Sequence, residues 1–74
     1  MPDRAIEPML LTINGESRKF DRRLNVSGLL EALSLEPRKI AVERNLEIVP
    51  KSLYGETALA DGDRIEIVHF VGGG

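Results

Sequence analysis

The fold is predicted first of all by MLLTINGE, the sequence of residues 9–16. Leu11 and Ile13 would share one face of a strand there, because successive side chains of a strand point to opposite faces. Asn14-Gly15 follows, and both residue types accept the positive φ angles of a two-residue hairpin turn. Residues 16–20 would return as a second, antiparallel strand, so the regular structure is expected to begin with a β-hairpin.

An amphipathic helix is expected next along the chain. Its apolar positions lie at the i, i+3, i+4 and i+7 spacing of one helix face: Val26, Leu29, Leu30 and Leu33. Asn25 precedes them and offers an N-cap side chain. Pro37 would stop any continuation of the helix beyond residue 36, because the residue before a proline is pushed out of the α region.

Three more strands are expected, at residues 39–44, 47–49 and 64–71, with Leu59 reaching the core from the loop before the last one. Asp61-Gly62-Asp63 is expected to form a tight turn before that strand, because Asp and Gly both suit turns. The order ββαββ, a loop and a final β predicts an α+β fold of the β-grasp type. This fold would be a mixed sheet of four to five strands packed on one helix. The last strand would lie beside the first in the middle of the sheet, since the helical connection allows a parallel pairing.

The length of 74 residues allows one small domain. We expect a flexible N-terminal extension at residues 1–8, the β-grasp domain at 9–71 and a flexible glycine tail at 72–74. A domain of this size has little room for a deep substrate pocket, which favours a binding or carrier role over an enzyme.

Composition excludes several functions. The net charge of -2 gives no field that would attract nucleic acid, and no apolar run reaches membrane-spanning length. Cysteine is absent, which rules out disulfides, thiolate metal sites and cysteine nucleophiles. The single histidine, His69, is more simply a strand residue than a general base. We therefore expect a cytoplasmic protein with no bound cofactor, no metal and no catalytic residue of its own.

The C-terminus is the unusual feature, because Gly72, Gly73 and Gly74 directly follow an apolar strand. Glycine has no Cβ, so this tail could enter a channel too narrow for other residues. Three extended residues reach roughly 10 Å. They would deliver a terminal carboxylate into the active site of another protein. That carboxylate resists nucleophilic attack until it is activated, most simply as an acyl-adenylate made from ATP, which a sulfur nucleophile could convert to a thiocarboxylate.

A candidate partner surface lies on the last strand. Ile65 and Ile67 would face the helix, whereas Val68 and Phe70 would face the other side of the sheet, which no helix covers. These two residues could form an exposed docking surface beside the tail. Alternatively, they could pack under the loop that contains residues 53 and 54, and the sequence leaves both possibilities open.

The ordered set of segments resembles the ThiS family of thiamine-pathway sulfur carriers. The segments are residues 11–16 (LTINGE), 26–33 (VSGLLEAL), 41–45 (AVERN), 48–50 (IVP), 61–67 (DGDRIEI) and 70–74 (FVGGG). The resemblance implies a ubiquitin-like β-grasp fold and adenylation of Gly74 by a ThiF-like enzyme that uses ATP. It further implies a thiocarboxylate whose sulfur comes from a donor such as a cysteine desulfurase, and delivery to a ThiG-like thiazole synthase. Residues 1–8 are not typical of this family.

Other functions share the same glycine end. The chain could be the small subunit of molybdopterin synthase, a carrier for tRNA thiolation or cysteine synthesis, or a ubiquitin-like protein modifier joined to lysines through Gly74. An interaction domain with an inert tail is a further alternative. The short Asn14-Gly15 hairpin and Ile48-Val49-Pro50 favour the thiamine assignment over molybdopterin synthase.

Overall fold

The structure is a computed structural model that describes residues 8–70. Its elements follow the predicted order: β1 (Met9–Ile13), β2 (Glu16–Phe20), α1 (Val26–Ala32), β3 (Ile40–Arg44), β4 (Glu47–Val49) and β5 (Arg64–His69). Two 3₁₀ turns, η1 (Pro37–Lys39) and η2 (Lys51–Leu53), lie on either side of the β3–β4 hairpin. The remaining residues of the predicted N-terminal extension and the glycine tail lie outside the described residues.

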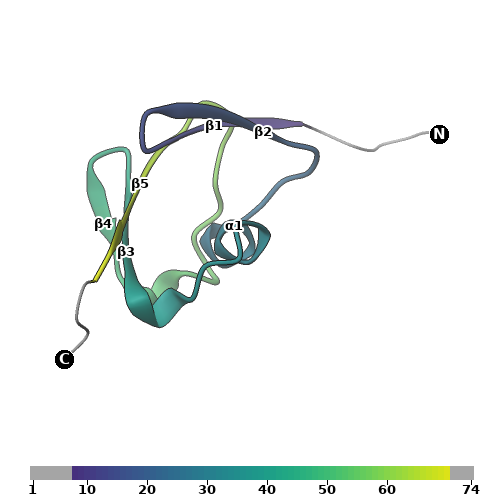
Figure 1. Ribbon diagram of the computed structural model, residues 1–74. Helices are drawn as coiled ribbons and strands as arrows, with labels where there is room; N and C mark the ends of the chain where they lie inside the picture. The colour runs from purple at the N-terminus through teal and green to yellow at the C-terminus, as the bar shows by residue number, and fades with distance from the viewer. Residues whose placement is uncertain (1–7, 71–74) are drawn as a thin grey trace.

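The five strands form one mixed sheet in the order β2-β1-β5-β3-β4, which curves around α1 (Figure 1). β5 occupies the centre, where it pairs in parallel with β1 and antiparallel with β3. Both hairpins, β1–β2 and β3–β4, are antiparallel. The predicted placement of the last strand beside the first is therefore confirmed. Among the described residues, no helix has the length and apolar character needed to cross a membrane.

The β1–β2 turn also binds the central strand. Asn14 and Gly15 have φ angles of 51° and 86°, as the predicted two-residue hairpin requires. The Asn14 side chain makes two hydrogen bonds with the backbone of Ile67 in β5. Its Oδ1 accepts from the Ile67 amide at 2.7 Å, and its Nδ2 donates to the Ile67 carbonyl at 3.2 Å. Asn14 thus forms part of the hairpin turn. Its side chain also adds two hydrogen bonds to β5 beyond the last residue pair of β1 and β5.

Both ends of α1 are closed by local hydrogen bonds. The predicted N-cap is confirmed, since Asn25 Oδ1 accepts from the Gly28 amide at 2.7 Å. The helix ends at Ala32, before the proline that was expected to stop it. Ser34 has a φ of 60°, and the amide of Leu35 donates to the carbonyl of Leu30. This is the Schellman arrangement, in which a left-handed residue turns the chain back on the last helical turn.

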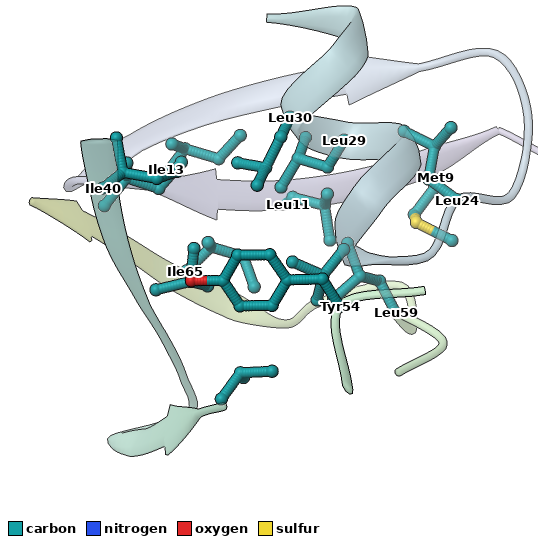
Figure 2. Packing of buried hydrophobic residues seen from close by; sticks show 14 residues of the cluster. Met9, Leu11, Ile13, Leu24, Leu29, Leu30, Ile40, Tyr54, Leu59 and Ile65 are labelled. Atoms are coloured by element: carbon teal, nitrogen blue, oxygen red, sulfur yellow. The ribbon is translucent and has the colours of Figure 1, made fainter. Parts of the chain in front are cut away.

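The core lies between α1 and the concave face of the sheet, and Figure 2 shows its packing. The buried apolar residues are Met9, Leu11, Ile13, Leu24, Val26, Leu29, Leu30, Ile40, Val42, Val49, Tyr54, Leu59, Ile65 and Ile67. Leu59 enters this cluster from the loop, as predicted, and Tyr54 does so as well. Each fully buried leucine contributes about 1.5–3 kcal/mol relative to an exposed one.

The last strand is shorter than the sequence suggests. β5 ends at His69, which pairs with Ile40, the first residue of β3. Phe70 therefore has no strand residue opposite it, and its amide instead donates to the carbonyl of Lys39 in η1 at 2.9 Å. This hydrogen bond attaches the backbone of Phe70 to η1 just after the end of β5.

Candidate functional site

The candidate site is the end of β5, from which the chain continues to the predicted reactive terminus. Phe70 is the last described residue, and Gly74 follows it four positions later in the sequence. Four extended residues span about 14 Å at most. Gly72, Gly73 and Gly74 themselves lie outside the described residues, so their predicted role stays a prediction. The structure shows the base from which they start.

The two residues of the candidate partner surface are exposed. Val68 and Phe70 keep 58% and 53% of their surface accessible, whereas Ile65 and Ile67 are buried under α1. Of the two possibilities left open by the sequence, exposure is the one observed, and neither side chain is buried beneath the loop. Contact with a partner stays a prediction. Two adjacent exposed apolar residues nevertheless provide contact area next to the chain end.

The rest of this sheet face carries charges of both signs, because Arg64 alternates with Glu66 and Val68 along β5. Glu66 on β5 stands opposite Glu43 on β3, and Glu43 also stands opposite Ile48 on β4. Ile48 is 74% exposed, and Val68 stands opposite Ala41. We call these residues the outer sheet face: Ala41, Glu43, Ile48, Glu66 and Val68. It combines apolar area with two neighbouring carboxylates, and Arg64 lies next to Glu66 on the same face of β5.

A buried carboxylate fixes the start of β5. Asp63 accepts hydrogen bonds from Arg44 Nε at 2.7 Å, Asn45 Nδ2 at 3.0 Å and the Ala60 amide at 2.8 Å. Burial raises the pKa of Asp63, but the hydrogen bonds from Asn45, Ala60 and Arg44 outweigh it, so this pKa lies below its usual value. Sequence reasoning treated Asp61-Gly62-Asp63 only as a tight turn. Gly62, with a φ of 92°, confirms that turn.

Lys51 is a second residue that sequence reasoning missed. Its Nζ donates to the Ile40 carbonyl at 2.6 Å and lies 5.1 Å from the centre of the Phe70 ring. Nothing in the spacing of the sequence signals this contact, since nineteen positions separate the two residues. Only the sheet topology, which places η2 beside the end of β5, brings them together.

Groups that could perform catalysis are scarce in the described part of the chain. His69 is exposed at the end of β5. Among residues 8–70, no group of three or more His, Asp or Glu side chains could hold a metal ion. What the geometry does provide is an anchored central strand with two exposed apolar residues, Val68 and Phe70, at its end.

Comparison with known proteins identifies the family. The model of the ThiS family matches residues 11–74. The sulfur carrier protein ThiS of Bacillus subtilis is 46% identical over 66 residues, which cover 88% of this chain and all of that protein. The chain belongs to the ThiS family. The predicted family is thereby confirmed.

A solved structure of this family has the same fold. The crystal structure of the thiamine biosynthesis protein ThiS from Geobacter metallireducens superposes with a TM-score of 0.78 and 38% identity. The match covers 89% of this chain and all of that one. The predicted ubiquitin-like β-grasp fold is therefore confirmed.

A third relative embeds the ThiS-like segment in a longer protein. Thiazole synthase of Paramagnetospirillum magneticum is 58% identical over 66 residues, covering 89% of this chain. Those residues are 20% of that protein, so the chain spans about a fifth of this relative's length. The chain of that thiazole synthase thus contains a segment that is similar to this ThiS-family chain.

Proposed function

We propose that the chain is a sulfur carrier of thiamine biosynthesis and that it carries sulfur as a thiocarboxylate on Gly74. The observation that supports this most directly is the family match, which runs from the first strand through the final glycine. A carrier needs a rigid body that partners can recognise and a free end that reaches their active sites. The β-grasp body supplies the first part, and we propose that residues 71–74 supply the second.

The chemistry follows from the terminal carboxylate. With a pKa of about 3.3–3.7 it is ionised at neutral pH and resists attack. An adenylating enzyme of the ThiF type would join it to AMP from ATP and release pyrophosphate. A sulfur nucleophile would then attack the acyl carbon, form the carbon–sulfur bond and expel AMP. The thiocarboxylate sulfur would then form a bond to the acceptor, and water would cleave the acyl carbon–sulfur bond and supply the oxygen that restores the carboxylate, so the chain is a cosubstrate.

Thiazole synthase is the acceptor that we propose. The support is the relative of that name, which contains a segment 58% identical to this chain. Joining a carrier to its acceptor raises their effective concentration, which favours partners that already react with each other. The ThiF-like enzyme and a sulfur donor such as a cysteine desulfurase are proposed on family grounds alone. The cytoplasmic location stays a prediction.

The test is conversion of the chain end. The full chain is incubated with a ThiF-type adenylating enzyme, ATP and inorganic sulfide, and its intact mass is measured. We expect exchange of one terminal oxygen for sulfur. A variant that lacks Gly73 and Gly74 should melt at the same temperature and stay unmodified. An unmodified full chain, beside a reference carrier that the same enzyme converts, would contradict the proposal.

A second step tests the acceptor. The thiocarboxylated chain is supplied either to thiazole synthase or to the large subunit of molybdopterin synthase, each with its other substrates. We expect sulfur transfer only in the first reaction. Transfer only to the second enzyme would assign the chain to molybdopterin synthesis. Isopeptide adducts of Gly74 on lysines, in place of both reactions, would identify a protein modifier.

A further inference from the structure

The ammonium group of Lys51 contacts three separate parts of the fold. Its Nζ lies 2.6 Å from the Ile40 carbonyl oxygen, 5.1 Å from the centre of the Phe70 ring and 5.9 Å from the centre of the Tyr54 ring. Ile40 belongs to β3, Phe70 follows β5, and Tyr54 follows η2 in the loop that reaches the core. Each ring contact is within the roughly 6 Å at which a cation is attracted to an aromatic face.

The hydrogen bond from Lys51 Nζ to the Ile40 carbonyl gives the lysine at position 51 a structural role. The pairing of β4 with β3 ends at Val49 opposite Val42, so Ile40 lies beyond the reach of β4. Lys51 follows β4 by two residues and donates to the Ile40 carbonyl in its place. The ammonium group is thereby held at a fixed point on the edge of the sheet, because a short charge-assisted hydrogen bond restricts it.

Phe70 depends on that fixed charge. Its ring is half exposed, so burial of apolar surface holds it only weakly, and its backbone makes one described hydrogen bond, to the Lys39 carbonyl. β5 has already ended at His69. The Lys51 cation, 5.1 Å from the ring centre, is a further interaction that joins the Phe70 side chain to the rest of the domain.

We propose that Lys51 is a positioning residue of the carrier reaction. By holding Phe70, it fixes the point and direction from which the last four residues leave the domain. This inference rests on the function proposed above. These four residues reach at most about 14 Å, so a shift of their starting point by several ångströms moves the whole set of positions that Gly74 can occupy by the same amount. Reactive groups must be placed much more closely than that.

The contact is tested first in the isolated, full-length chain, where no partner takes part. Backbone ¹⁵N relaxation is measured for Phe70 and Val71 in the wild type, K51M, K51R and F70L. In the wild type we expect the Phe70 order parameter to be close to about 0.85, and in K51M and F70L to fall towards about 0.6. K51R should restore it, because arginine keeps both the donor and the cation.

A matched control separates the contact from a general loss of charge. Lys39 is adjacent to Phe70 through its backbone, but its Nζ lies 3.6 Å from the Glu36 carboxylate. K39M therefore removes one positive charge nearby and should leave the order parameter of Phe70 unchanged. F70L keeps the Lys51–Ile40 hydrogen bond, so it reports on the ring contact even if K51M does not fold.

The functional readout is the steady-state adenylation of the chain as a substrate. For K51M we expect the KM to rise about two- to fivefold, the ratio that corresponds to an exposed cation–π contact, with kcat unchanged. K51R and K39M should behave as the wild type. A normal KM for K51M, or an order parameter at Phe70 that does not change in K51M and F70L, would overturn the proposal. A wild-type chain that is not adenylated at all would instead refute the proposed function, and the positioning role with it.

Discussion

At the residue scale, Asp63 illustrates how one side chain determines where the central strand begins. Its carboxylate joins the turn before β5 to Arg44 and Asn45 at the β3–β4 hairpin. Asn45 in turn accepts from the Arg64 amide through its Oδ1 at 2.9 Å. The start of β5 is thus fixed by side chains as well as by the ladder of the sheet. A change at Asp63 should therefore affect the whole domain.

We expect the stability of the domain to fall in acid through Asp63. A carboxylate whose pKa is lowered by folding stabilises the protein above its unfolded pKa of about 3.9, and this contribution is lost as the pH falls through the folded pKa. D63N should lower the free energy of unfolding at pH 7 by about 2 kcal/mol, since it places an amide where three donors converge. Urea denaturation at pH 7, 5 and 3 measures both effects.

D21N serves as the control, because Asp21 is exposed. It should unfold as the wild type does at every pH. The loss of stability between pH 5 and pH 3 should be smaller in D63N than in the wild type. Equal losses in the two proteins would show that other groups cause the acid sensitivity.

Sequence reasoning located these residues only in part. Asp61-Gly62-Asp63 was predicted as a turn because Asp and Gly are typical of turns, and this is confirmed. The bonds of Asp63 and the contacts of Lys51 were not foreseen. They join residues far apart in the chain, so they depend on the register of the strands, which residue types alone do not determine.

At the scale of elements, the β3–β4 hairpin contains a residue that does not match its backbone conformation. Asn45 and Leu46 have φ angles of 52° and 74°. The first suits asparagine, but the second usually requires glycine, because a side chain with a Cβ is strained there. Leu46 is also 80% exposed, so burial does not offset this cost.

Replacing Leu46 with glycine should therefore stabilise the domain. We expect L46G to raise the free energy of unfolding by about 0.5–1 kcal/mol, which corresponds to a few degrees in Tm. L46A is the matched control: it removes the apolar surface but keeps the Cβ, so it should gain little. Thermal unfolding followed by circular dichroism compares the three proteins. A gain in L46A equal to that in L46G would attribute the effect to the exposed side chain instead.

The elements themselves were largely predictable, and their ends less so. Periodicity identified the five strands and the helix, since alternation and the i, i+3, i+4 spacing are local properties. Pro37 set only an outer limit for the helix, which ends at Ala32 because Ser34 adopts a left-handed conformation that serine rarely signals. β5 stops at His69 because β3 offers no partner beyond Ile40.

At the scale of the whole molecule, one helix and one sheet face make up the core. Domains of this size rarely gain more than about 3–5 kcal/mol from such a core. Leu30 is fully buried between α1 and the sheet (Figure 2). L30A should cost about 2–5 kcal/mol, which is comparable to the total stability.

We accordingly expect L30A to be substantially unfolded at room temperature by far-ultraviolet circular dichroism, and to be a poor substrate for adenylation although its glycine end is intact. L10A, at a half-exposed position of β1, should remain folded and be adenylated normally. Full adenylation of an unfolded L30A would show that partners recognise the tail alone and not the folded domain.

The central position of β5 has a mechanical consequence. Any tension on the chain end would enter the domain at Phe70 and run lengthwise along β5. Both neighbouring strands hold β5 through hydrogen bonds that lie across this direction, so the bonds resist together in shear. A terminal strand peeled sideways from the sheet would instead lose its bonds one at a time. The described chain therefore ends on the strand that two neighbours hold against a lengthwise pull.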